Sequence, residues 1–329
     1  MKKYNLNRLG NGRIGVIGDF CLDVYWEADM RRSELSRETP HFPLPVMRER
    51  MSPGGAGNVV MNLLALEPKA VYAVGVFGDD WRGTSLRALL KKAGADVSGV
   101  VVDPARVTNT YIKPLRRGFS DDVIYEDPRL DFTNYDALSA ASERKILKAL
   151  DAVAKKVDVL CVCDQMPFGC ITGKVRERIV ALGKAGLKVF VDSRDRIGLY
   201  SGVVVKPNEI ESARVFEGKI PDTAFERLAR ALEERTGCPA IVTAGAKGCY
   251  ISEGGAVRHV RACKVTGEID FCGAGDTFLS GLAASTAAGF QLADAATIAC
   301  CCSAVTIKKL KTTGTASRSE LSAVLRSYA

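Results

Sequence analysis

The sequence has little histidine and no apolar run long enough to cross a membrane. Its 329 residues include 2 His against 11 Cys, and no second cysteine pair is spaced to match Cys161 and Cys163. We therefore expect no transition-metal site. The most apolar stretch, residues 282–307, is interrupted by Gln291 and Asp294. That pattern favours a pair of buried helices over a membrane span.

The start of the sequence also lacks the hydrophobic stretch that directs secretion, because Arg8 and Arg13 occur before any apolar run develops. The cysteines are odd in number and three of them are adjacent at 300–302. This spacing does not suit a framework of disulfides, and reduced thiols are typical of the cytosol. We expect a cytoplasmic protein that contacts no membrane.

Two common nucleotide-binding fingerprints are missing as well. No Gly-x-x-x-x-Gly-Lys-Ser/Thr occurs, and no Gly-x-Gly-x-x-Gly follows the first predicted strand. The sequence therefore gives no support to a P-loop enzyme or a dinucleotide-dependent dehydrogenase.

What is present is the composition of a folded globular protein, with 47% hydrophobic and 26% charged residues. The 46 Lys and Arg exceed the 38 Asp and Glu, giving a net charge of +8. The excess is spread along the chain without a basic block, which suits small anionic ligands. We predict no nucleic-acid partner.

Strand-like and helix-like segments alternate along most of the chain. Residues 13–18 are a short apolar run ending in Gly, typical of a buried parallel strand. The repetition predicts an α/β fold whose central sheet is mostly parallel and covered on both faces. Further predicted strands are 70–77, 157–163, 188–192, 203–205 and 240–243, and predicted helices are 58–66, 81–93, 142–156, 174–185, 221–236 and 276–288.

Two stretches, at about 25–51 and 108–132, break this alternation. They lack helical periodicity and contain prolines at 40, 43, 45, 114 and 128. Long featureless loops are uncommon in compact domains, so we predict that these stretches form a small β lid.

The sharpest chemical signal is Gly273-Ala274-Gly275-Asp276 at the start of a predicted helix. Small residues let the backbone approach an anion, and the free amides at a helix N-terminus favour negative charge. Asp276 beside such an anion hole can accept a proton from an attacking hydroxyl. The alternative is that Asp276 only caps the helix, and spacing does not decide between them.

A second polar group is expected where open α/β sheets bind ligands, at the carboxyl ends of the strands. Asp19 and Asp23 follow the first strand, and Gly54, Gly55 and Asn58 form a glycine-rich turn before a helix. Carboxylates and an amide suit the hydroxyls of a sugar. The alternative, turn and cap residues, applies more readily to Asp19 than to Asp23.

Four motifs in register identify a family. The sequence resembles the PfkB (ribokinase-like) sugar kinases across nearly its whole length, and the segments 18–26 and 36–46 look most like the heptose-phosphate kinases of that family. Those enzymes often carry Lys where this chain has Arg194. The four motifs are Gly-Gly-Ala-Gly-Asn at 54–58, Lys-Pro-Asn-Glu-Ile-Glu at 206–211, Thr-Ala-Gly-Ala-Lys-Gly at 243–248 and Gly-Ala-Gly-Asp at 273–276.

The resemblance implies a single ribokinase-like three-layer domain over residues 1–329, with the lid often joining two protomers as a homodimer. It implies ATP and Mg²⁺ as cofactors, with the metal held indirectly through Asn208 and Glu211. The helix pair at 282–307 would wall the adenine. By the same resemblance Asp276 is the catalytic base beside the anion hole of Gly273, Ala274 and Gly275, the other ATP-binding positions are Thr243, Gly245 and Gly248, and the sugar-binding positions are Asp23, Gly54, Gly55 and Asn58.

We therefore predict an ATP-dependent sugar kinase, with heptose 7-phosphate converted to heptose 1,7-bisphosphate as the leading reaction. One alternative is a fructokinase-like or ribokinase-like kinase of an unphosphorylated sugar or a nucleoside. Another is a non-catalytic binding protein on a kinase fold.

An acceptor that already carries a phosphate needs cations near the lid. Lys113 shares a face of its alternating run with Tyr111 and Leu115, which directs it toward the substrate. The alternative is that the lid cations are solvated charge. The other candidates are Arg31, Arg32, Arg37, Arg116 and Arg117.

Overall fold

The computed structural model describes residues 4–120, 123–310 and 313–328. Positions 121 and 122 of the second irregular stretch lie outside the described residues. In the described part the main sheet has nine strands in the order β14-β13-β12-β11-β10-β9-β1-β4-β5. The seven strands β12-β11-β10-β9-β1-β4-β5 pair in parallel with their neighbours. Strand β13 pairs antiparallel with both β12 and β14. Their bounds are β1 Arg13–Gly18, β4 Ala70–Gly78, β5 Asp96–Asp103, β9 Val159–Asp164, β10 Lys188–Ser193, β11 Val204–Val205, β12 Ala240–Thr243, β13 Cys249–Glu253 and β14 Ala256–Val260.

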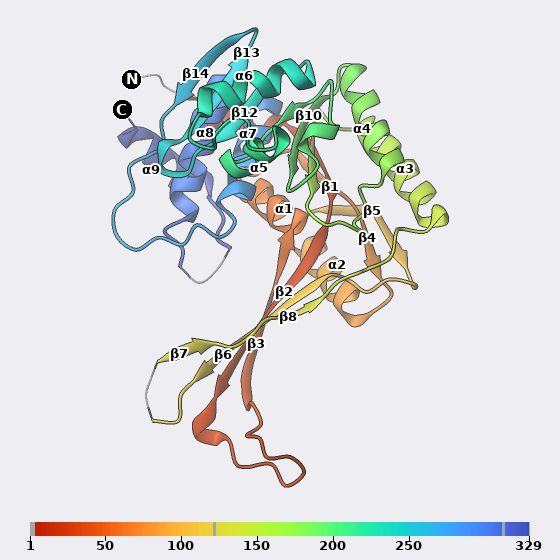
Figure 1. Cartoon of the computed structure of the whole chain (residues 1–329), viewed down its shortest axis with the longest axis vertical. Helices are drawn as coiled ribbons and strands as arrows, with labels where there is room; N and C mark the ends of the chain where they lie inside the picture. The colour runs from red at the N-terminus through yellow and green to blue at the C-terminus, as the bar shows by residue number, and fades with distance from the viewer. Residues whose placement is uncertain (1–3, 121–122, 311–312, 329) are drawn as a thin grey trace.

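Helices cover both faces of this sheet, which gives three layers (Figure 1). Strand β1 shows the cause: Ile14 and Val16 pack into one apolar cluster and Ile17 into the other, all fully buried. A strand buried on both sides is apolar throughout, as its sequence predicts. The helices are α1 Ala56–Ala65, α2 Trp81–Ala93, α3 Ala140–Ala154, α4 Gly173–Lys184, α5 Glu209–Val215, α6 Phe225–Thr236, α7 Ala274–Ala287, α8 Leu292–Thr306 and α9 Arg318–Ser327, with short 3₁₀ turns η1 Leu6–Asn11, η2 Met30–Arg32, η3 Ile197–Leu199 and η4 Gly245–Lys247. The expected α/β class and mostly parallel sheet are confirmed.

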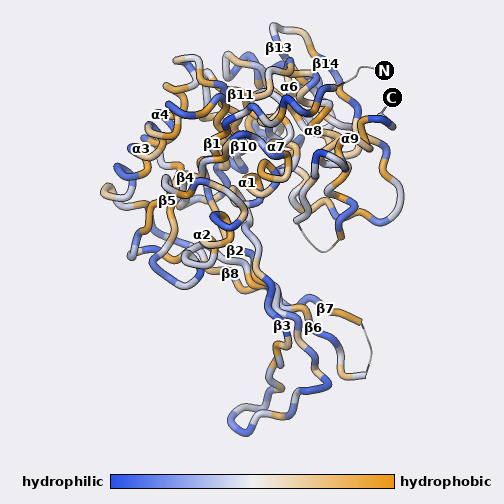
Figure 2. Tube along the Cα trace, turned by 180° about the vertical axis from the view of Figure 1, so that it is seen from behind, coloured by the Kyte–Doolittle hydropathy of each residue, from blue (hydrophilic) through white to orange (hydrophobic). Residues whose placement is uncertain are grey.

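A second, smaller sheet projects from the body (Figure 1). Its path is β3-β2-β6-β7, and β8 pairs with β6. Its strands run through both stretches that break the β/α alternation, and hydrophilic residues dominate the loop at its far end (Figure 2). The strands are β2 Phe20–Asp29, β3 Val46–Gly55, β6 Thr110–Arg117, β7 Ile124–Glu126 and β8 Leu130–Phe132.

The chain differs from its expected layout near the first strand. Only Asp19 separates β1 from β2, so Asp23 lies inside a strand and not in a loop after β1. Residues 52–55, expected as a turn, are the last residues of β3. Both differences arise because β2 and β3 pair along their length up to the start of α1, with Phe20 opposite Gly55. No described helix is long and apolar enough to cross a membrane.

Candidate active site

Gly273 immediately precedes helix α7 as its N-cap, and its left-handed backbone (φ 75°) is one that glycine adopts readily. A side chain there would also collide, since a Cβ atom would lie 2.6 Å from Nδ2 of Asn58. One of the three amides expected to form the anion hole is already used, because Ala274 N–H donates to the Phe271 carbonyl at 3.1 Å. The Gly275 amide has no partner among the described residues. The first turn of α7 therefore leaves at least this donor available to an anion.

Asp276 lies in that first turn and is held by a chain of amides. Asn58 Nδ2 donates to Oδ2 of Asp276 at 2.8 Å, across a separation of 218 residues. Asn62 Nδ2 in turn donates to Oδ1 of Asn58 at 3.1 Å, and Thr277 Oγ1 donates to Oδ1 of Asn62 at 3.0 Å. This chain fixes which way each amide faces. We expected Asn58 to serve a ligand, and the structure also makes it a partner of Asp276.

Burial raises the pKa of Asp276 to about 6, and nearby Asp192 adds to the increase, while the hydrogen bond from Asn58 and the charge of Lys206 oppose it. Asp276 as a whole residue is half-buried. A carboxyl with this pKa is mostly ionised at neutral pH and is still a useful base.

Lys206 is a buried cation beside the helix start that we did not single out from the sequence. Its Nζ lies 2.9 Å from Oδ2 of Asp192, and a Cβ on Gly275 would lie 3.6 Å from it. Burial acts to lower the pKa of Lys206, but Asp192, Glu211 and Asp276 outweigh it and raise that pKa. The site thus holds a fixed positive charge next to the free Gly275 amide. The motif at 206–211 contained this signal, but the pairing with Asp192 depends on the sheet.

Asn208 and Glu211 form a capping box at the start of α5. Asn208 Oδ1 accepts from the Glu211 amide at 2.8 Å, and Glu211 Oε2 accepts from the Asn208 amide at 2.9 Å. Burial raises the pKa of Glu211. Thr243 lies beside them, because Asn208 and Thr243 form an isolated parallel bridge.

Gly245 is the first residue of η4 and Gly248 directly follows its last residue. Both glycines have positive φ values, but their surroundings differ. A Cβ on Gly248 would overlap the Val260 carbonyl, so this glycine is needed for packing, whereas Gly245 faces open space. Among the described residues no group of three His, Cys, Asp or Glu side chains could hold a metal ion. Asn208 and Glu211 carry oxygen donors of the kind that Mg²⁺ prefers, which is compatible with the predicted Mg²⁺ held through its own waters.

Asp23 is the main polar group at the other end of the site. Its Oδ1 lies 3.5 Å from Nζ of Lys113, which also donates to the Tyr25 hydroxyl at 3.3 Å. Gly54 is required here, since a Cβ would lie 2.5 Å from Oδ2 of Asp23. Burial raises the pKa of Asp23, and Lys113 opposes this. The Asp23 charge also raises the pKa of Asp276, so the structure brings these two predicted site residues together.

Asp19 does not join this group. Its carboxylate accepts hydrogen bonds from the amides of Gln165, Met166 and Cys170 at 2.8 to 2.9 Å, and burial raises its pKa to about 6. These three bonds hold the loop after β9, so the turn-forming alternative applies to Asp19. Gly55 adopts φ 56° above the Asp19 carbonyl, and we find no opening for a ligand between them.

Two further arginines lie near Tyr111, and neither was assigned a role in binding from the sequence. The charge of Arg129 acts on Asp23 and its guanidinium lies 4.3 Å from the Tyr111 ring centroid. Arg194 is exposed and follows β10. Its charge acts to lower the pKa of both Tyr111 and Glu211, whereas burial raises the pKa of both groups.

Arg116 does not belong with these cations. It lies three positions after Lys113 on β6 and therefore on the opposite face of the strand, and its Nε is 3.0 Å from both carboxylate oxygens of Asp127. Strand alternation explains the difference.

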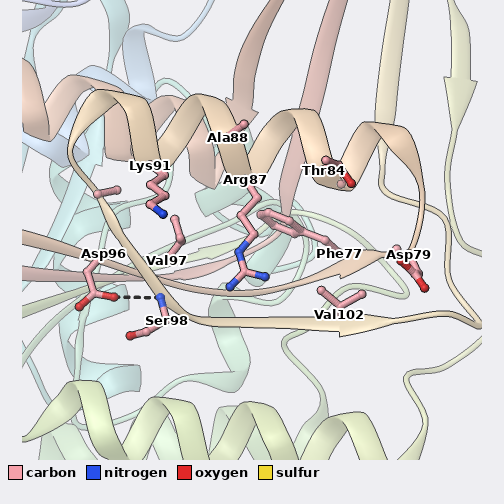
Figure 3. A pocket seen from close by; sticks show the side chains of 13 residues that line it. Phe77, Asp79, Thr84, Arg87, Ala88, Lys91, Asp96, Val97, Ser98 and Val102 are labelled. Atoms are coloured by element: carbon pink, nitrogen blue, oxygen red, sulfur yellow. Dashed lines mark hydrogen bonds between the residues drawn. The ribbon is translucent and has the colours of Figure 1, made fainter.

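A groove of about 720 Å³ lies elsewhere, between α2 and β5, and holds none of the predicted site residues (Figure 3). Arg87 and Lys91 of α2 point toward it, opposite Asp96 and Ser98 of β5. It is separate from the arrangement around Asp276.

Comparison with known proteins places this site in a family. The model of the pfkB family of carbohydrate kinases matches residues 20–318. The bifunctional protein HldE of Geotalea uraniireducens is 33% identical over 310 residues, which covers 90% of this chain and 60% of the relative. HldE of Gluconobacter oxydans is 31% identical over 323 residues, covering 94% of this chain and 64% of the relative. The chain thus spans about 60% of the length of these relatives.

Solved structures agree on the fold. Phosphofructokinase-2 from Escherichia coli, in complex with substrates and products, superposes with a TM-score of 0.73 at 18% identity, covering 96% of this chain and 99% of that one. Ribokinase from Arabidopsis thaliana, complexed with ribose and ATP, gives a TM-score of 0.70 at 18% identity and covers 97% and 100%. With the ribokinase-like fold and the family match in agreement, the chain belongs to the pfkB family of carbohydrate kinases.

Proposed function

We propose that this kinase transfers the γ-phosphoryl group of ATP to the anomeric hydroxyl of a heptose 7-phosphate, with Asp276 as the base. The observation that carries the chemistry is the placement of Asp276 in the first turn of α7, in contact with Asn58 and close to buried Lys206. The observation that supports a phosphorylated acceptor is the set of cations around Asp23.

Asp276 accepts the proton of the acceptor hydroxyl as the phosphoryl group is transferred. Its pKa of about 6 leaves it ionised at neutral pH and still basic enough to take a proton in the transition state. Asn58 holds the carboxylate by one oxygen, Oδ2, which leaves Oδ1 to receive the hydroxyl. Positioning of this kind is the main part of catalysis in phosphoryl transfer.

Negative charge that develops on the transferred group meets the Gly275 amide and the Lys206 ammonium. Both are held before substrate binds, the amide by the helix and the ammonium by its ion pair with Asp192. Preorganised donors stabilise a transition state without reorganisation during the reaction. The Ala274 amide becomes a further donor to this negative charge once its hydrogen bond to the Phe271 carbonyl is released.

ATP is proposed to lie along Asn208, Glu211, Thr243, Gly245 and Gly248, with helices α7 and α8 beside the adenine. Asn208 and Glu211 would hold Mg²⁺ through water, since Glu211 retains its second carboxylate oxygen and Asn208 Oδ1 retains a second lone pair beyond the capping bonds. When bound, Mg²⁺ neutralises phosphate charge.

The acceptor is proposed to lie between Asp276 and Asp23, with its hydroxyls on Asp23 and Asn58. Gly54 and Gly55 would serve it indirectly, because their lack of side chains leaves room for Asp23 and for the Asp19 carbonyl. Its phosphate would be gripped by three cations that surround Tyr25 and Tyr111, namely Lys113, Arg129 and Arg194. The resemblance of segments 18–26 and 36–46 to heptose-phosphate kinases, and the HldE relatives, support heptose 7-phosphate.

The smaller sheet is proposed to act as the lid, as part of one kinase domain over residues 1–329. Closing it over the acceptor would exclude water that could compete for the phosphoryl group. We further propose that two lids join as a homodimer, because the smaller sheet exposes several apolar side chains.

The test is ATP turnover by the purified chain with Mg²⁺ and a panel of heptose 7-phosphate, the free heptose, fructose 6-phosphate, fructose and ribose. We expect kcat/KM for heptose 7-phosphate to exceed that for the free heptose by about a hundredfold or more, as loss of charge-assisted contacts implies. Equal activity on free sugars would replace the proposal with a fructokinase-like or ribokinase-like enzyme. No turnover with any acceptor would favour a binding protein on this fold.

A further inference from the structure

Two thiols from separate parts of the fold lie almost in bonding range. Cys263 belongs to the loop between β14 and α7, and Cys301 lies in α8. Their sulfur atoms are 3.2 Å apart and the residues are 38 positions apart in sequence. A disulfide bond is about 2.0 Å long, so an approach of about 1 Å would close it.

The two thiols differ in access. Cys301 is fully buried, whereas Cys263 is partly exposed at the surface of the main apolar cluster. The hydrogen bond with Cys301 lowers the pKa of the Cys263 thiol against the effect of burial. Neighbouring Cys249, Cys300 and Cys302 are all buried. Cys263 is therefore the thiol of this group that an oxidant in solvent reaches first.

We propose that Cys263 and Cys301 form a reversible disulfide that ties the loop at 261–273 to α8. A metal is not a competing explanation, because no group of three His, Cys, Asp or Glu in the described ranges could hold one. This inference goes beyond the proposed function, because the disulfide can form whether or not the chain has that function.

The oxidant is a peroxide. The Cys263 thiolate attacks one oxygen of hydrogen peroxide, the O–O bond breaks, and with one proton taken up the products are a sulfenic acid at Cys263 and water. The Cys301 sulfur then attacks the Cys263 sulfur and displaces hydroxide, which takes the Cys301 proton to give a second water. Two thiols have lost two electrons to one peroxide. A dithiol reductant reverses the bond by exchange.

The tied loop leads directly into the active site. It ends at Gly273, and its backbone is otherwise held at few points, including Asp270 N–H to the Ile307 carbonyl at 2.8 Å and the Tyr328 hydroxyl to the Arg261 carbonyl at 2.9 Å. Helix α8 contacts the same region, since Ser303 donates to the Ala274 carbonyl at 3.1 Å. The Ala274 amide must leave Phe271 to serve an anion. A bond between loop and helix restrains that change and slows turnover.

The test treats the full chain with hydrogen peroxide, then compares non-reducing peptide maps, thermal melting and ATP turnover before and after dithiothreitol. After oxidation we expect the mass of the chain to fall by two hydrogen atoms and a linked pair of peptides to appear in the map. The oxidised chain should melt several degrees higher and turn over ATP several-fold more slowly, and dithiothreitol should reverse all four changes. The loss of either thiol, in Cys263→Ser or Cys301→Ala, should abolish the link.

Matched variants assign the bond. Cys272 and Cys300 to Cys302 have no Lys or Arg between them, so trypsin leaves them on one peptide and the map alone does not name the partner. Cys300→Ala and Cys272→Ser should keep the link, as should Cys238→Ser, a partly exposed thiol before β12. A link that survives Cys301→Ala, or no link in the unmodified chain, overturns the proposal. A disulfide link without any change in turnover would overturn the proposed effect of the link on the reaction. The peptide map and the melting curve do not require kinase activity, so they test the disulfide even if the chain proves not to be an active kinase.

Discussion

Asp276 has a proton affinity set by its surroundings, and this affects both catalysis and stability. Its folded pKa of about 6 lies above the ordinary 3.8. A raised carboxyl pKa means that the folded state binds the proton more tightly than the unfolded state, so this residue stabilises the fold at low pH and its contribution falls as pH rises through about 4 to 6. The position is one where function opposes stability.

The first prediction concerns the pH dependence of turnover. Because Asp276 must be ionised, kcat/KM should fall as the pH drops below about 6. The hydrogen bond from Asn58 lowers the Asp276 pKa, so Asn58→Leu should move this acidic limb to higher pH. The measurement is a pH–rate profile. Asn5→Ala, which removes a cap of η1 instead, is the control and should leave the limb in place; an unmoved limb in Asn58→Leu would argue against Asp276 as the titrating group.

The second prediction separates the two lid cations that the sequence grouped together. Lys113→Ala should raise the KM for the sugar phosphate by about ten- to a hundredfold, the usual range for a lost charge-assisted bond, with little change for ATP. Arg116→Ala removes an equal charge from the other face of β6, where Asp127 binds it, and should leave both KM values nearly unchanged. Steady-state kinetics check this. Equal effects of the two variants would mean that the lid cations act only as general surface charge.

At the scale of elements, the accuracy with which the sequence predicts a helix or strand depends on the burial of that element and on its end signals. Strand β1 and helix α2 were expected within their observed bounds, because one is an apolar run ending in Gly and the other is capped by Asp80 and closed by Gly94. The sequence predicted a small β lid over about 25–51 but not the bounds of strands β2 and β3, because β3 is exposed over its first four residues and the two strands carry charges such as Glu27 and Glu49. Helix α5, with seven residues, is too short for a periodic signal.

The site divides in the same way. Asp276, Asn208 and Glu211 lie in local motifs, so the resemblance was enough to propose them. The contacts that tune them are not local: Asn58 reaches Asp276 across 218 residues, and Lys206 reaches Asp192 across adjacent strands. Such pairs depend on sheet order, which periodicity does not provide.

The third prediction tests the start of α7. Gly273→Ala should destabilise the fold by about 1 to 2 kcal/mol from the left-handed backbone alone, and its Cβ should also displace Asn58 and reduce turnover. Gly267→Ala has a similar positive φ of 93° but open space around its Cβ, so it should share the loss of stability and keep normal turnover. Chemical unfolding and turnover measure the two effects. Normal turnover in Gly273→Ala would show that this close approach does not matter.

At the scale of the whole molecule, the smaller sheet is the part least covered by the rest of the chain. Val46 and Met47 of β3 are 42% and 54% exposed, and Ile124 of β7 is 51% exposed. Exposed apolar side chains on a projecting sheet are typical of a surface that pairs with another molecule. A second copy of the same sheet would bury them on both sides of a two-fold axis.

The fourth prediction follows from that symmetry. We expect a dimer in sedimentation equilibrium, and Ile124→Asp should weaken it by about a hundredfold or more because each dimer loses the buried side chain twice. Leu199→Asp places the same change on an equally apolar residue of the body, 59% exposed, and should have no effect. A monomer at all concentrations, or a dimer weakened only by Leu199→Asp, would contradict a lid-to-lid interface.

The central claim, that the molecule is a sugar kinase with Asp276 as its base, is tested most directly by the rate of phosphoryl transfer in Asp276→Asn. The substitution keeps the shape of the side chain and removes the group that takes the proton. With saturating ATP and heptose 7-phosphate, kcat should fall by about two to four powers of ten while ATP affinity is nearly unchanged. A variant that transfers the phosphoryl group at close to the normal rate would contradict the account.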